Sequence, residues 1–186
     1  MTPWTFETLA ASDRDKLEKV LRAGRPPEYD QLEGYLYRGW NHERVSRLTG
    51  EKFKKAFRRK DERRVGYNEV CHQDGKGYGG EWRVKMRDGE PRRIGYYRVA
   101  LVEDEPPRPP HGDYPHAVLF DYNVDLNMSW RDTPLRVIRD IVVLPNPGDH
   151  ELMLGKAYLQ LGFPWLNVFY SYFVLGHRTP IEREPW

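Results

Sequence analysis

The chain has 186 residues, 39% of them hydrophobic, which suffices for one domain that buries roughly 70% of the surface exposed by its unfolded form. Its single cysteine, Cys71, excludes an intrachain disulfide and favours a reducing compartment. No apolar run approaches the roughly 20 residues of a membrane helix, and no secretion signal is evident, so we expect a cytoplasmic protein. The formal net charge is only +2, yet residues 51–64 carry eight Lys or Arg and three Asp or Glu.

A helix is the first predicted element, over residues 13–23. The segment from Ser12 to Asp15 has the S-x-x-D form of a helix start, apolar residues follow at helical spacing, and Gly24 stands where a C-terminal cap is common. Residues 33–40, rich in Tyr and Trp, then predict a first β-strand.

The next segment is basic and is predicted to be a second helix, inserted after the first strand. Val45, Leu48, Phe53, Ala56 and Phe57 form an apolar stripe opposite the Lys and Arg side chains, so this helix is expected to pack as a lid or plug on the sheet. Its charges suit contact with phosphate. Because its two Phe residues share the inner stripe, we expect no nucleic-acid binding; a solvated face and a peripheral contact with an anionic membrane both stay open.

Strand-length runs of β-branched and aromatic residues fill the rest of the chain, separated by Gly, Pro, Asn or Asp. With the first strand they number eight, at which an antiparallel sheet closes into a barrel with room for side chains or one small ligand. Asp88-Gly89 and residues 146–149 suit hairpin turns. The predicted strands cover residues 65–73, 81–87, 93–102, 116–124, 135–144, 151–160 and 167–178.

The sequence therefore predicts a mainly β protein. We expect a single domain over 1–186, with an N-terminal helical extension at 1–32, a barrel at 33–178 and a tail at 179–186. Residues 103–115 include five prolines, which predicts an extended and stiff loop.

Several motifs suggest chemistry but have simpler interpretations. Residues 75–80 match G-x-G-x-x-G, but a strand rather than a helix follows, so a flexible hairpin is preferred to a dinucleotide site. Cys71 and His72 are neighbours in a predicted strand and point to opposite faces, so they form no dyad, and Cys71 is expected to be buried. The six histidines lack metal-ligand spacing. We expect no metal and no cofactor; haem held by one histidine inside the barrel stays an alternative.

Charged residues embedded in the strand runs are more informative. Asp121, Arg139, Asp140 and Lys156 each interrupt apolar sequence, and alternation sends Arg139 and Asp140 to opposite faces. An unpaired charge inside a barrel is costly, so an inward charge indicates an ion pair or a polar ligand group. Positions on the wet outer face are the alternative.

The two ends of the barrel region resemble those of a lipocalin-like (calycin) barrel. The residues are Gly34-Tyr35-Leu36-Tyr37-Arg38-Gly39-Trp40 and Gly176-His177-Arg178. In that superfamily an arginine of the last strand crosses a first-strand tryptophan of a G-x-W motif and closes one end; here Gly39 directly precedes Trp40. The resemblance implies an eight-stranded lipocalin-like barrel closed by Trp40 and Arg178. The pattern over 33–178 also looks like small uncharacterised bacterial proteins of this type, which implies a fold more than an activity.

The leading functional hypothesis is binding of a small hydrophobic or amphipathic molecule in the lumen, with aromatic side chains supplying burial and polar groups orienting the ligand. The sequence sets no oligomeric state. The candidate ligand-binding residues are Tyr37, Asn68, Tyr97, Asp121, Asn123, Arg139, Lys156, Tyr158 and Tyr172.

An alternative hypothesis is an enzyme of proton-transfer type, an isomerase, cyclase or lyase, acting on such a ligand in the same cavity. Asp121 or Asp140 is then the base, and a tyrosine or lysine is the acid or stabilises charge. A third hypothesis is an interaction protein that uses the basic helix at an anionic surface.

Overall fold

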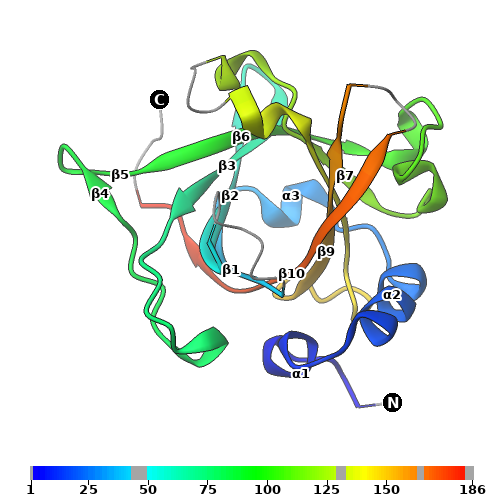
Figure 1. Ribbon diagram of the computed structural model, residues 1–186, viewed down its shortest axis with the longest axis horizontal. Coiled ribbons are helices and arrows are strands. Elements are labelled where there is room, and N and C mark those ends of the chain that lie inside the picture. The colour runs from blue at the N-terminus through cyan, green and yellow to red at the C-terminus, as the bar shows by residue number, and fades with distance from the viewer. Residues whose placement is uncertain (1, 43–49, 129–132, 163–165, 183–186) are drawn as a thin grey trace.

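The computed structural model describes residues 2–42, 50–128, 133–162 and 166–182. They form a closed β-barrel accompanied by short helices (Figure 1). The α-helices are α1 (Phe6–Ala10), α2 (Arg14–Ala23) and α3 (Tyr29–Leu32). The strands are β1 (Tyr35–Asn41), β2 (Lys52–Lys60), β3 (Arg63–Val70), β4 (Met86–Arg87), β5 (Glu90–Pro91), β6 (Arg93–Leu101), β7 (Val118–Asp121), β8 (Ile138–Val143), β9 (Met153–Gln160) and β10 (Asn167–Pro180).

Eight antiparallel strands close the barrel in the order β1-β10-β9-β8-β7-β6-β3-β2. Closure results from β1, which pairs with β10 on one side and with β2 on the other. The predicted eight-stranded antiparallel barrel is thus confirmed. One of the eight predicted strands is wrong, because residues 81–87 do not join the barrel. The eighth barrel strand is β2.

The predicted basic helix is wrong where the structure describes it: β2 occupies residues 52–60. Phe53, Lys55 and Phe57 recur every second residue and face the interior, so the period is that of a strand. The predicted helix counted Ala56 in the same apolar stripe as Phe53 and Phe57. In the strand, Ala56 is buried on the outer face, opposite to those two residues. The other members of the predicted stripe, at 45 and 48, lie outside the described residues.

Residues 81–87 belong instead to an arm that projects from the barrel and carries the β4–β5 hairpin (Figure 1). Its turn is the predicted Asp88-Gly89, with φ of 55° and 82°, the left-handed conformation of a two-residue hairpin loop. The arm begins with Cys71 paired to Val84. Trp82 then lies against the outer wall, where its indole N–H donates to the carbonyl of Gly39 at 3.0 Å.

The predicted helix at 13–23 is confirmed as α2. Its cap is Asp13, whose carboxylate accepts a hydrogen bond from the backbone N–H of Lys16 at 2.8 Å. The buried face of α2 includes Leu17 and Leu21, which pack on the outer wall of the barrel together with outward residues such as Ile141. The strand surfaces that α2 covers are therefore apolar, although they lie on the outside of the barrel.

Helix α3 closes one end of the barrel. In Figure 1 this helix lies within the outline of the barrel. Leu32 is fully buried, and the Tyr29 hydroxyl donates to the carbonyls of Arg58 and Val65 near the β2–β3 turn. Both residues pack with interior side chains such as Phe57. The barrel interior is consequently plugged at this end.

The remaining described connections are irregular or contain short 3₁₀ helices. The predicted proline loop between β6 and β7 has two such turns rather than one extended course. In the described part of the chain, no helix has both the length and the apolar character needed to cross a membrane. The 3₁₀ helices are Gly77–Gly79, Val102–Asp104, His111–Asp113, Asp125–Asn127 and Thr133–Val137.

Candidate functional site

A cluster of polar side chains lies inside the barrel. Lys55 of β2 donates from Nζ to the Tyr122 hydroxyl at 2.5 Å and to Asp140 Oδ2 of β8 at 3.1 Å. Tyr122 in turn donates to the same carboxylate oxygen at 3.0 Å. Asn68 of β3 donates from Nδ2 to the Tyr122 hydroxyl at 3.3 Å and to the carbonyl of Gly95 at 3.1 Å. Four strands or strand ends thus contribute to one hydrogen-bonded group.

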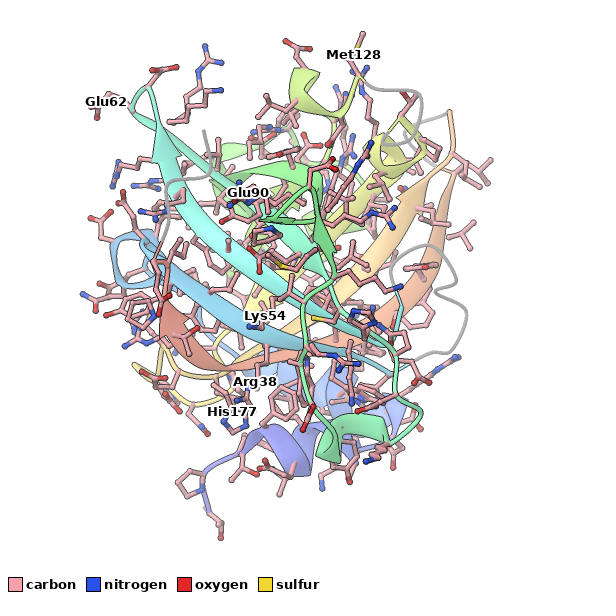
Figure 2. All side chains as sticks on the ribbon, turned by 90° about the vertical axis from the view of Figure 1, so that its left-hand side faces the viewer. Arg38, Lys54, Glu62, Glu90, Met128 and His177 are labelled. Carbon is pink, nitrogen blue, oxygen red and sulfur yellow. The ribbon has the colours of Figure 1, made fainter. Side chains whose placement is uncertain are left out.

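Lys55 illustrates how the sequence positions this group. Neighbouring Lys54 lies on the outer face of β2, beside Arg38 of β1, on the side that faces the viewer in Figure 2. Lys55 points inward with only 1% of its side chain exposed. Its ammonium nitrogen lies within 4.5 to 5.7 Å of five ring centroids, so aromatic faces and one carboxylate replace water around it. The five rings are those of Phe53, Tyr97, Phe120, Tyr122 and Phe173.

Burial dominates the electrostatics of the cluster. It lowers the pKa of Lys55 and raises the pKa of Asp140, because each charged form loses its hydration; their mutual attraction opposes both shifts. Burial, followed by the charge of Asp140, raises the pKa of Tyr122 well above its usual value. Burial therefore favours transfer of a proton from Lys55 to Asp140, and the attraction between the two charges opposes it.

A cavity of about 40 Å³ lies beside the cluster, toward the end of the barrel opposite α3. It is far smaller than the roughly 300–1,000 Å³ pockets that enclose drug-sized ligands. Most of the remaining interior is filled by aromatic and aliphatic side chains. The cavity is lined by Asn41, Phe53, Lys55, Asn68, Glu69, Val70, Ile94, Tyr122, Leu135, Ile138, Asp140, Ala157, Tyr170 and Phe173.

Asn68 has an unsatisfied hydrogen-bond acceptor at this cavity. Its side chain is buried, and its Oδ1 has no hydrogen-bond partner among the described residues, although Nδ2 has two. A buried acceptor without a partner costs about 1–3 kcal/mol. The side chain of Asn68 therefore carries one unsatisfied acceptor beside the cavity.

Three of the nine candidate ligand-binding residues do face the interior. Asn68 lines the cavity. Tyr97 stacks its ring near the Lys55 ammonium, and its hydroxyl donates to the carbonyl of Ala56 at 2.7 Å. Tyr37 lies away from the cavity, with its hydroxyl donating to the carbonyl of His150 at 2.8 Å.

Asp121 and Arg139 were expected to be candidates for the lumen, but they lie on the outer wall. Asp121 forms ion pairs with Arg98 at 2.9 Å and with Arg139 at 3.1 Å, and Arg98 also pairs with Glu105 at 2.5 Å. Asn123, on the same side of the strand, accepts from Arg136 and is exposed. Of the two candidate bases, only Asp140 lies at the cavity.

Lys156, Tyr158 and Tyr172 also lie outside the barrel, beneath α2. Glu18 of α2 accepts from Lys156 at 2.7 Å and from the Tyr172 hydroxyl at 2.6 Å. Tyr158 packs in the same outer cluster, with its hydroxyl 3.5 Å from that of Tyr114. These polar groups attach α2 to the barrel wall.

The expected contact between Trp40 and Arg178 is wrong. Trp40 pairs with Val174 in the β1–β10 ladder and packs edge-on with Tyr78, whereas the Arg178 guanidinium lies 4.2 Å from the ring centroid of Tyr35. An arginine of the last strand does cross an aromatic residue of the first strand. The aromatic residue is five positions earlier than the sequence resemblance implied.

Sequence reasoning missed Lys55 and Tyr122. Lys55 was hidden among the other basic residues of its segment, but alternation with Phe53 and Phe57 was a signal that could have found it. Tyr122 was placed correctly on the face opposite Asp121, but only the charged face was taken as functional.

The other motifs contribute little to this site. A 3₁₀ turn and extended chain follow Gly75, and Cys71 is fully buried as predicted. No histidine belongs to the described lining of the cavity, so the residues there do not fit haem ligation. Likewise, the described ranges contain no cluster of three or more His, Cys, Asp and Glu suited to a metal ion.

Fold and site together define a closed eight-stranded antiparallel barrel, consistent with a calycin-like fold, with one buried polar cluster. Comparison of the chain with protein-family models, curated proteins and solved structures found no match. Function is therefore argued from the site alone.

Proposed function

We propose that the protein binds a small amphipathic molecule whose polar end enters the barrel at Lys55, Tyr122, Asp140 and Asn68. The observation that carries the proposal is the buried side chain of Asn68, which lines the cavity and whose Oδ1 lacks a hydrogen-bond partner among the described residues. A ligand that donates a hydrogen bond there removes the cost of the unsatisfied acceptor.

The cavity volume selects the amphipathic form of the hypothesis over the wholly hydrophobic one. About 40 Å³ holds a polar group of a few atoms and not a fatty acid or a retinoid. The cavity wall also includes apolar side chains, of which Ile94 and Tyr170 are partly exposed. They supply a surface for the apolar remainder of the ligand at the mouth.

Isoleucine methyl signals provide a direct test. The chain has four isoleucines: Ile94 and Ile138 line the cavity, Ile141 faces α2 on the outer wall, and Ile181 lies on the outside beyond β10. Titration with 1-hexanol is expected to shift the δ1-methyl signals of the first two and to leave the other two unchanged. Equal shifts at all four positions, or none at the cavity pair, would contradict the proposal.

A variant pair sharpens the test. Asn68→Leu removes the acceptor and keeps a side chain branched at Cγ, and it is expected to weaken 1-hexanol binding about three- to tenfold, the worth of one hydrogen bond. Asn123→Leu changes the same residue type on the exposed outer wall and should leave affinity unchanged. If both variants bind like the original protein, Asn68 does not orient the ligand.

A second candidate function is proton transfer on the bound molecule. It is favoured by Asp140, whose Oδ2 lies 3.0 Å from the Tyr122 hydroxyl and 3.1 Å from Lys55 Nζ at the cavity. Exchange of the α-hydrogens of acetone in D₂O should then be faster with the protein, and Asp140→Asn should abolish the acceleration. If the unmodified protein does not accelerate this exchange, the proton-transfer function is wrong and only the binding function remains proposed.

A further inference from the structure

Lys55 differs from buried Lys52 and partly buried Lys156 in having space beside it. Lys52 pairs with Asp74 at 2.5 Å and Lys156 pairs with Glu18 at 2.7 Å, and both lie outside the barrel. Neither belongs to the lining of the interior cavity, in which Lys55 is the only lysine among the described residues. An amine that faces a cavity, next to a carboxylate and a phenol, has the arrangement of an activated nucleophile.

We propose that the amphipathic ligand is a small carbonyl compound, an aliphatic aldehyde or ketone, and that Lys55 Nζ binds it as an imine. The proposal rests on the function proposed above and names the chemical class of the ligand. Unlike an alcohol, such a ligand gains a hydrogen-bond donor for Asn68 only when it adds to the amine.

The first step frees the amine. Asp140 takes a proton from the Lys55 ammonium along the 3.1 Å contact, which leaves a neutral amine and a neutral acid. The lowered pKa of Lys55 and the raised pKa of Asp140, both caused chiefly by burial, favour this transfer. The surrounding rings stabilise the ammonium and oppose the transfer, so the neutral amine is a minor form that reaction with the carbonyl consumes.

The second and third steps form the bond. The Nζ lone pair attacks the carbonyl carbon, the carbonyl π electrons move to oxygen, and this oxygen gains one proton while nitrogen loses one, giving a carbinolamine. Its hydroxyl then leaves as water after accepting a proton from Asp140, as the nitrogen lone pair forms the C=N bond of an iminium ion. The iminium returns its N–H proton to the Asp140 carboxylate to give the imine. Amine plus carbonyl gives imine plus water, and nothing is oxidised or reduced.

The unsatisfied acceptor Asn68 Oδ1 fits the intermediates of this reaction. An aldehyde carries no proton for Asn68 Oδ1, but the carbinolamine hydroxyl and the departing water both do. The acceptor is thus satisfied in the intermediates and not in the bound aldehyde. Differential stabilisation of this kind lowers the barrier to addition and dehydration.

Reductive trapping tests the proposal on the intact protein. The protein is incubated with hexanal and sodium cyanoborohydride at neutral pH, and hexylated lysines are located and timed by peptide mass spectrometry. Lys55 is expected to be alkylated faster than Lys52, which shares its burial and ion pairing but not the cavity. It should also react faster than Lys156, which is ion-paired and only partly buried. Similar rates at the three lysines would overturn the proposal.

An Asp140→Asn variant separates chemistry from access. Loss of the proton acceptor is expected to slow alkylation of Lys55 about a hundredfold. Alkylation of exposed lysines should not change. An unchanged Lys55 rate in this variant contradicts the role of Asp140.

The two proposals fail in different ways. If 1-hexanol shifts the signals of Ile94 and Ile138 but Lys55 is not alkylated, amphiphile binding stands and the imine is wrong. If neither occurs in the folded protein, both are wrong. Alkylation of Lys55 with unchanged isoleucine signals would support the covalent site and contradict reversible binding of alcohols.

Discussion

Lys55 and Asp140 meet across the full width of the barrel. Their strands, β2 and β8, are four places apart in either direction around the closed order, yet Nζ and Oδ2 are 3.1 Å apart. Both side chains are almost completely buried. An ion pair of this kind, removed from water, strongly penalises the loss of either member alone.

Lys55→Met is therefore expected to lower the free energy of unfolding by about 3–5 kcal/mol, because it leaves the Asp140 carboxylate buried without its cation. Urea titration followed by circular dichroism measures the change. Lys54→Met, on the outer face of the same strand, is the matched control and should change stability by about 0.5 kcal/mol or less. The double variant Lys55→Met/Asp140→Asn should lose less than the sum of the single losses; strict additivity would mean that the two residues are not coupled.

Glu18 makes stability sensitive to acid. Burial raises its pKa, but hydrogen bonds from Lys156, Tyr172 and Tyr114 outweigh burial and lower the pKa from 4.5 to about 2. Because the folded pKa is depressed, the stabilisation is fully present above pH 4.5 and is lost as pH falls from 4.5 toward 2. Unfolding free energies across this range should therefore fall less steeply in Glu18→Gln. Parallel pH profiles would show that Glu18 is not responsible.

Gly155 of β9 is a packing requirement. A Cβ there would lie 2.0 Å from Cζ of the Phe173 ring inside the barrel, so Gly155→Ala forces that ring to move and is expected to cost about 1–3 kcal/mol. A Cβ added at Gly79 would meet no described atom within 4 Å, so Gly79→Ala serves as the control. Thermal unfolding of both variants measures the difference, and equal melting temperatures would refute the predicted clash.

Cys71 should report on unfolding. It is fully buried, and burial raises the pKa of its thiol to about 11, so the thiolate is scarce at pH 8. A thiol reagent such as Ellman's is expected to react with the native protein only at the rate of opening and with the urea-unfolded chain at once. Rapid reaction of the native protein at pH 8 would contradict the burial of Cys71.

The number and direction of the strands could be predicted from the sequence because turn residues punctuate runs of even length. The face that each embedded charge occupies could not. Outward residues such as Ile141 and Val174 are as apolar as inward ones, because α1 and α2 cover part of the outer wall. Alternation correctly separated Asp121 from Tyr122, but hydrophobicity on both faces left the inner one undetermined.

The site was harder to predict than the fold for a related reason. Lys55 belongs to a run whose other cations lie outside or pair at the surface, as Lys52 and Arg59 do. The same run satisfies helical spacing through Ala56, so the two periods compete. Pairing of β2 with β1 and β3, its two neighbours in the chain, decides in favour of the strand.

The plug formed by α3 has one more consequence. Tyr29 and Leu32 fill this end of the barrel, so among the described residues the route to the Lys55–Asp140 pair lies at the opposite end. Under the proposed function, the polar end of the ligand would lie at this pair and its apolar end would stay at the opposite rim. The bound molecule would then remain accessible to a second macromolecule.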